Sequence, residues 1–169
     1  MLSTTRRSFA SRIACLFTGL SASSLLSGSA HAAPKGNSSV SKLNYEGGPA
    51  DPTALFSPAV VHNGVIYISG QGAHSRDPEG KFPADIETHT TKVMDNVKTL
   101  VEAGGGTMDS VLQLNVYLAS IDDYAGMNKV FKNYFPHGGP ARTTVAVAAL
   151  PGQSLVEVNC IAAVVRKQT

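Results

Sequence analysis

The sequence predicts an α+β domain in which two helices cover one face of a mostly antiparallel sheet. Apolar residues recur at helical spacing in residues 86–103 and again in residues 120–134. Stretches rich in β-branched residues lie before, between and after these two segments. Apolar residues make up 43% of the 169-residue chain and charged residues only 15%, which is typical of a folded domain with a core. The predicted order of elements is ββ-α-β-α-ββ.

The first half of the domain contains a hairpin followed by a helix. Strands at residues 58–62 and 65–69 flank the Asn63-Gly64 pair, a dipeptide that favours a tight turn between strands. Residues 40–45 are expected to form a short edge strand before this hairpin. The helix over residues 86–103 begins after Asp85, which can cap it, and stops at the run of glycines 104–106.

The second half contains a strand, a helix and two further strands. Residues 111–118 alternate, which places Leu112, Leu114, Val116 and Leu118 on one face. A helix begins at Ser120 and ends before Pro136. Strands at residues 142–150 and 155–165 are expected to pair through a turn at Pro151-Gly152. Both faces of these last strands carry small or apolar side chains, so we expect a second copy of the chain to cover the face without helices.

Residues 1–32 have the features of a signal peptide. The segment starts basic, continues with a mildly apolar stretch too short for a permanent membrane anchor, and ends with Ala30 and Ala32, an A-x-A cleavage pattern. The Arg6-Arg7 pair resembles a twin-arginine export signal, and an ordinary Sec signal is the alternative. We therefore expect three segments: the leader 1–32, a flexible lead-in 33–54 and the domain 55–167. The mature protein is expected in the periplasm or outside the cell.

Charge and side-chain chemistry exclude several classes of function. The leader holds three arginines and no acid, so removing it leaves 11 Lys and Arg against 12 Asp and Glu. A surface so balanced does not favour nucleic-acid binding. The histidines after the leader lack metal-ligand spacing and no nucleotide-binding motif occurs, so neither a metal nor a cofactor is expected. Cys160, in an apolar run, is interpreted as a core residue, with a reactive thiol as the alternative.

Two charged residues stand out as candidates for chemistry. Arg142 follows Gly138-Gly139-Pro140-Ala141 at the head of a strand, where its guanidinium can bind a carboxylate through two parallel hydrogen bonds. A structural ion pair is the alternative for this arginine. Glu157 interrupts the apolar run LVEVNCIAAVV, and a buried acid there is suited to proton transfer. Alternatively, Glu157 lies on the solvent-exposed face of an edge strand and has no chemical role. If the last two strands pair directly, Arg142 and Glu157 share a face.

Seven short motifs, in their order and spacing, resemble the Rid family of reactive-intermediate deaminases, also called YjgF proteins. The similarity extends over residues 55–165. The motifs are Ser57 with Ala59-Val60, Ile68-Ser69-Gly70-Gln71, Gly80-Lys81-Phe82-Pro83-Ala84-Asp85, Asn128, Pro140-Ala141-Arg142-Thr143, Val147-Ala148-Ala149-Leu150-Pro151 and Val156-Glu157-Val158. The resemblance implies a chorismate-mutase-like homotrimer with clefts between subunits. It also implies hydrolysis of 2-imino and 2-enamino acids to 2-keto acids and ammonia.

The same resemblance implies a role for each site residue. Arg142 would hold the substrate carboxylate and Glu157 would position the attacking water or carry protons. The pocket would be lined or supported by Ser69, Gly70, Phe56, Asn128 and Thr144. Two positions depart from the family, since Phe56 stands where active members usually have Tyr, and Thr144 where Cys is common. The alternatives are a non-catalytic trimer that binds small carboxylates and, against the charge balance, an RNA-cleaving enzyme.

Overall fold

A computed structural model of the chain describes residues 39–73 and 85–165. Six strands and two α-helices follow one another in this part of the chain. They are β1 (Ser41–Leu43), β2 (Ala59–His62), β3 (Val65–Gly72), α1 (Ile86–Ala103), β4 (Val111–Leu118), α2 (Tyr124–Tyr134), β5 (Ala141–Ala146) and β6 (Val156–Ala163). This confirms the predicted α+β order, and β1 lies within residues 40–45, where a short edge strand was expected.

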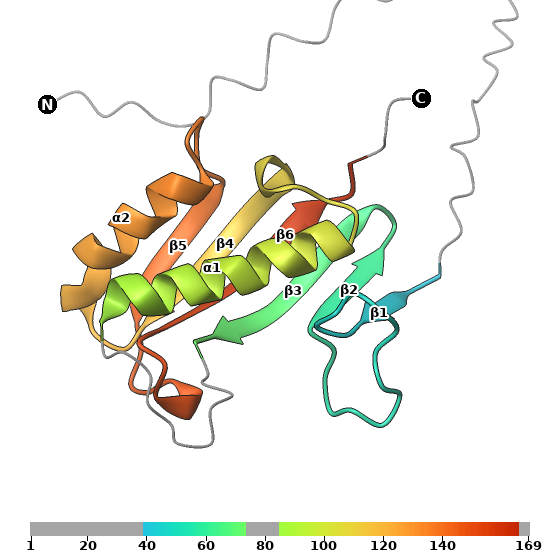
Figure 1. The fold of residues 1–169 in the computed structure, drawn as a ribbon, viewed down its shortest axis with the longest axis horizontal. Helices are drawn as coiled ribbons and strands as arrows, with labels where there is room; N and C mark the ends of the chain where they lie inside the picture. Colours follow the sequence, from blue (N-terminus) through green and yellow to red (C-terminus); the bar gives the residue numbers. More distant parts are fainter. Residues whose placement is uncertain (1–38, 74–84, 166–169) are drawn as a thin grey trace, which may run out of the picture. The chain divides into compact units, whose positions relative to one another are not determined.

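The strands form one sheet in the order β1-β2-β3-β6-β4-β5, and both helices lie on the same face of it (Figure 1). All neighbouring strands are antiparallel except β4 and β5, which are parallel and joined by α2. A parallel pair needs a crossover connection, and α2 supplies it. The last strand of the chain, β6, thus lies in the middle of the sheet, whereas β5 lies at its edge.

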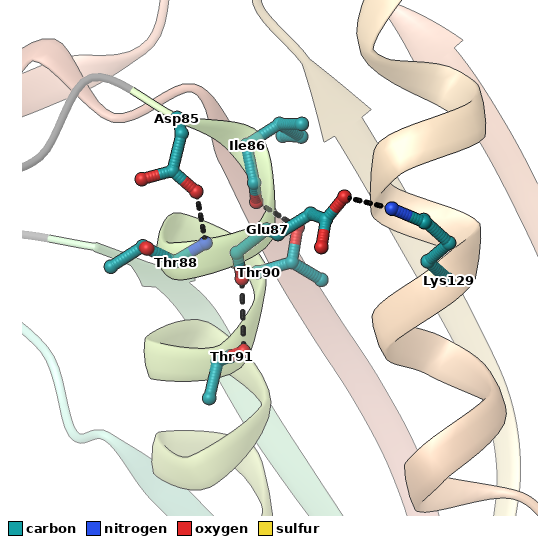
Figure 2. Close-up of polar contacts among 7 residues, drawn as sticks. All are labelled: Asp85, Ile86, Glu87, Thr88, Thr90, Thr91 and Lys129. Atoms are coloured by element: carbon teal, nitrogen blue, oxygen red, sulfur yellow. Dashed lines mark hydrogen bonds and ion pairs between the residues drawn. The ribbon is translucent and has the colours of Figure 1, made fainter.

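Helix α1 begins and ends where local sequence signals place its ends. The Asp85 carboxylate accepts a hydrogen bond of 2.8 Å from the Thr88 N–H, which satisfies one of the free donors of the first turn (Figure 2). At the other end, the Gly104 N–H donates to the Leu100 carbonyl at 3.0 Å. A Cβ on Gly104 would lie 2.8 Å from the Ile66 side chain, so this glycine also lets the helix end pack closely on β3.

Contacts between the two helices are polar at the surface and apolar beneath. The Lys129 ammonium of α2 forms an ion pair of 2.6 Å with Glu87 of α1 (Figure 2). The Tyr134 hydroxyl donates to the Asp95 carboxylate at 2.7 Å. Burial, and then this hydrogen bond to Asp95, raise the pKa of Tyr134, so its hydroxyl stays protonated at physiological pH. These contacts hold α2, and with it the segment that leads into β5, at a defined place on the sheet.

The core lies between the helices and the sheet face that they cover. It is formed by alternate residues of the strands and by one face of each helix, including Ile66, Val97, Leu114, Met127 and Val158. On β6 the alternation is regular, with Val156, Val158, Cys160 and Ala162 buried and the residues between them half-buried. Cys160 is 3% exposed, which confirms its interpretation as a core residue. Alternation therefore decides which β6 side chains point away from the helices, and Glu157 is one of them.

The structure corrects three details of the predicted strands. Leu112 is 53% exposed rather than inward-facing, because a register shift between Val111 and Gln113 turns it out of the sheet. The strand predicted over residues 142–150 stops at Ala146. The expected hairpin between the last two strands is also wrong. β4 lies between β5 and β6, and the Pro151-Gly152 segment is a short 3-10 turn (Pro151–Gln153) rather than a hairpin turn.

Two predicted features lie outside the described residues. These are the leader at residues 1–32 and the motif at residues 80–84. No helix in residues 39–73 and 85–165 is long and apolar enough to cross a membrane.

Candidate functional site

Arg142 lies near the start of the edge strand β5 and points toward helix α2. In the parallel register it is opposite Leu114, which is fully buried beneath the helices. The guanidinium carbon lies 5.1 Å from the centre of the Phe131 ring and 6.0 Å from that of Tyr124. One of its nitrogens also donates weakly to the Met127 sulfur, at 3.9 Å.

Stacking on aromatic faces orients a guanidinium while leaving its N–H edge available to a ligand. Within the described part of the chain, no carboxylate forms an ion pair with Arg142. The alternative of a structural ion pair therefore gains no support there. Among the described residues, the rings and the sulfur of α2 hold the arginine in place, and no opposite charge does.

A pocket of about 710 Å³ adjoins Arg142. This volume lies in the range that suits small-molecule ligands. Its walls come from β4, from α2 and from the segment that leads into β5. They are formed by Leu114, Asn128, Phe131, Lys132, Phe135, Gly139, Pro140 and Arg142. The pocket thus brings together two of the predicted site residues, Arg142 and Asn128, and adds a second cation, Lys132.

Glu157 lies in a different place, on the sheet face without helices. It is opposite Tyr117 of β4 and Gly72 of β3. A Cβ added to Gly70 would lie 2.9 Å from the Glu157 carboxyl carbon and would overlap one of its oxygens. The carboxylate therefore lies directly over the Gly70 backbone, so these two candidate residues are neighbours.

A β-bulge makes this approach possible. The register of β3 against β6 shifts between Ile68 and Gln71, so Ser69 and Gly70 together oppose the single residue Asn159. A bulge of this kind twists the strand and redirects its side chains. The Ser69 hydroxyl donates to the Pro58 carbonyl at 3.1 Å and accepts from the Gln71 amide at 3.1 Å. These hydrogen bonds hold the bulge to the segment before β2 and to the next part of β3.

Buried polar residues support the segment just before Glu157, and sequence reasoning missed them. The Ser154 hydroxyl donates to the Val156 carbonyl at 2.6 Å and accepts from the Ala73 N–H at 2.9 Å. The Leu155 N–H donates to Nδ1 of His89, a ring that is 3% exposed. A histidine inside the apolar stripe of a predicted helix, as His89 is, indicates a buried hydrogen bond and is the signal that could have found it.

The remaining two predicted residues, Phe56 and Thr144, do not line the pocket beside Arg142. Phe56 is 61% exposed, in the segment before β2. Thr144 follows Arg142 by two residues and pairs in register with the buried Val116, so it points toward the helices as Arg142 does. The Thr144 hydroxyl is shielded from solvent and has no hydrogen-bond partner among the described residues.

The expectation that Arg142 and Glu157 share a face is wrong. Arg142 is in register with Leu114 and, through it, with Cys160, whose side chains are buried under the helices. Glu157 is three residues from Cys160 on the same strand, and side chains alternate along a strand. The two candidate residues therefore lie on opposite faces of one sheet, and a single subunit does not bring them together.

Neither a reactive thiol nor a metal site is found among the described residues. Burial raises the pKa of the Cys160 thiol to about 12, which keeps it protonated and unreactive at neutral pH. Among residues 39–73 and 85–165, no three His, Cys, Asp or Glu side chains come together as a metal site would require.

Comparison with known proteins identifies the fold and the family. The profile described as Endoribonuclease L-PSP matches residues 48–164. A RutC family protein of Pyrococcus horikoshii is 33% identical over 111 residues, which are 66% of this chain and 88% of the relative. The mitochondrial protein mmf2 of Schizosaccharomyces pombe is 36% identical over 112 residues, which are 64% of this chain and 86% of the relative.

Solved structures agree with these relatives. RidA from an Antarctic Psychrobacter species is 33% identical, with a TM-score of 0.62, over 72% of this chain and 98% of that one. The YjgF gene product of E. coli is 29% identical, also with a TM-score of 0.62, over 72% of this chain and 97% of that one. The fold is thus that of a Rid-type α+β domain. The chain belongs to the Endoribonuclease L-PSP family, which includes the YjgF, RutC and Rid proteins.

Proposed function

We propose that the protein is an exported hydrolase that converts 2-imino and 2-enamino acids into 2-keto acids and ammonia. The observation that carries the proposal is the Arg142 guanidinium. It is stacked on Phe131, has no carboxylate partner among the described residues, and faces a pocket of about 710 Å³. An arginine held in this way suits a planar carboxylate, which it can bind through two parallel hydrogen bonds.

The proposed reaction needs no cofactor because an imine carbon is already electrophilic. Water attacks this carbon and forms a C–O bond, while the carbon–nitrogen double bond becomes a single bond and the nitrogen takes up a proton. Loss of ammonia from the resulting carbinolamine breaks the C–N bond and leaves the 2-keto acid. An enamine first gains a proton at carbon and loses one from nitrogen, which gives the imine. Glu157 would accept the proton of the attacking water and return it to nitrogen.

The proposal requires a second copy of the chain, because Arg142 and Glu157 lie on opposite faces of one sheet. β5 is an edge strand, so the Arg142 pocket is accessible to a neighbouring subunit. None of the described helices lies on the face that carries Glu157, and this face exposes Tyr67 by 47% and Val145 by 43%. We propose a homotrimer in which the Glu157 face of one subunit meets the Arg142 edge of the next, completing three clefts.

Residues 1–32 are proposed to direct export, so the mature protein would begin near Ala33. N-terminal sequencing of protein isolated from the native host tests this, and a chain that still begins with Met1 or Leu2 contradicts it. Replacing Arg6 and Arg7 by lysine then separates the two routes. Loss of export indicates the twin-arginine route, and unchanged export indicates Sec.

A coupled assay tests the activity. An amino-acid oxidase generates 2-iminopropionate from alanine, and semicarbazide captures the imine that escapes hydrolysis. The purified chain should lower the rate of semicarbazone formation in proportion to its concentration, and light scattering should report three copies. A rate equal to that without protein contradicts the enzyme proposal.

A non-catalytic carboxylate-binding trimer is the second candidate. The separation of Arg142 from Glu157 within one subunit favours it, because binding through Arg142 alone needs no second residue. Pyruvate binding without imine hydrolysis would indicate this function.

A further inference from the structure

The pocket beside Arg142 contains a second positive charge. Lys132 lies one helical turn after Asn128 on α2, and residues four apart share a helix face. Both line the pocket together with Arg142, and among the described residues no Asp or Glu does. The described walls of the pocket therefore present two cations and an amide, with no opposite charge among them.

Lys132 differs in this respect from its neighbour Lys129. Lys129 lies on the same helix and is paired with Glu87 at 2.6 Å (Figure 2). Within residues 39–73 and 85–165, no carboxylate forms an ion pair with Lys132 or with Arg142. Two cations on one pocket repel each other, and a ligand with two negative charges relieves this repulsion at both ends.

The two cations suit different parts of such a ligand. Arg142 is held against the Phe131 ring, so its planar guanidinium can bind a carboxylate in a fixed orientation. Lys132 carries a compact ammonium on a flexible stem, so it can bind a second anionic group of the ligand at different distances from the first. Between them the pocket is walled by apolar side chains of Leu114, Phe131 and Phe135, which suit a short aliphatic linker.

We propose that this pocket selects 2-imino dicarboxylic acids, the imines of acidic amino acids, over imines with a single carboxylate. Arg142 binds the carboxylate next to the imine carbon, and Lys132 binds the distal carboxylate. The assignment of a substrate class rests on the proposed function, and the reaction itself is the same hydrolysis. The oxidation of acidic amino acids is the class of reaction that would supply these substrates.

The test compares two imines in the same assay with the full chain. A glutamate oxidase supplies 2-iminoglutarate, and oxidation of alanine supplies 2-iminopropionate. The parent protein should have the higher kcat/KM for 2-iminoglutarate. Lys132→Met removes the charge and keeps an unbranched stem, and it should lower the ratio of the two kcat/KM values about three- to tenfold. Lys129→Met, on the same helix but outside the pocket, should leave the ratio unchanged.

A binding measurement separates failure of this inference from failure of the proposed function. Calorimetry with the stable products, 2-oxoglutarate and pyruvate, needs no catalysis. If the parent hydrolyses neither imine but binds 2-oxoglutarate more tightly, and Lys132→Met loses that preference, the enzyme proposal fails and the dicarboxylate site stands. Equal binding of both products by the parent, or a substrate ratio unaffected by Lys132→Met, overturns the inference.

Discussion

Replacing Gly70 by alanine tests whether the position of the Glu157 carboxylate matters for the proposed reaction. The new Cβ would lie 2.9 Å from the Glu157 carboxyl carbon, whereas carbon atoms in contact are about 3.5–4.0 Å apart. The carboxyl group must therefore move by roughly 1 Å. A displacement of that size at a reacting group costs on the order of 100-fold in rate. We expect kcat/KM for 2-iminopropionate to fall by about this factor.

The fold should tolerate the Gly70→Ala change. Gly70 does not have a positive φ, so alanine can adopt its backbone conformation. The overlapping atoms belong to the end of a flexible side chain rather than to the backbone. Thermal unfolding and the number of subunits should therefore match those of the parent protein.

A double-mutant cycle decides whether Gly70 acts through Glu157. Glu157→Ala removes the carboxylate that the new Cβ would displace, so adding Gly70→Ala to that variant should cause no further loss. Two outcomes would refute the reasoning. One is a Gly70→Ala protein with the parent rate, and the other is a loss of equal size in both backgrounds.

Three further predictions use other parts of the structure. Arg142→Ala should lose two charge-assisted hydrogen bonds to the substrate, about 2–3 kcal/mol, which is roughly a 30- to 160-fold fall in kcat/KM. Arg142→Lys should have a kcat/KM between those of Arg142→Ala and the parent. An Arg142→Ala protein with the kcat/KM of the parent would show that Arg142 does not bind the substrate. His89→Ala should lower the free energy of unfolding in urea by about 1–3 kcal/mol, because the partly buried Leu155 N–H loses its acceptor. His89→Gln offers another acceptor and should cost less; equal losses would contradict this role. In a Cys15→Ser variant the Cys160 thiol, whose pKa burial raises to about 12, should not react with a disulfide reagent at pH 8 until the protein is unfolded. Rapid reaction of the native protein would contradict that.

The elements that the sequence predicts correctly are those whose ends or positions are marked by residues close by in the chain. Helix α1 was predicted with its bounds because Asp85 and Gly104 mark its two ends within a single turn. Glu157 was recognisable because an acid interrupts an apolar strand, and the structure places it against Gly70. Lys132 was missed, although its spacing of four from Asn128 on a predicted helix was a usable signal.

The sequence alone determined the class of fold, the family and the identity of the candidate residues, because these depend on periodicity and on short motifs. Only the tertiary structure decided that β6 inserts between β3 and β4, and that Arg142 and Glu157 consequently point to opposite faces. Strand order is set by contacts between distant segments, and moving one residue along a strand reverses the face of a side chain. The same holds for the bulge at Ser69 and Gly70, since it exists only in the register of β3 against β6.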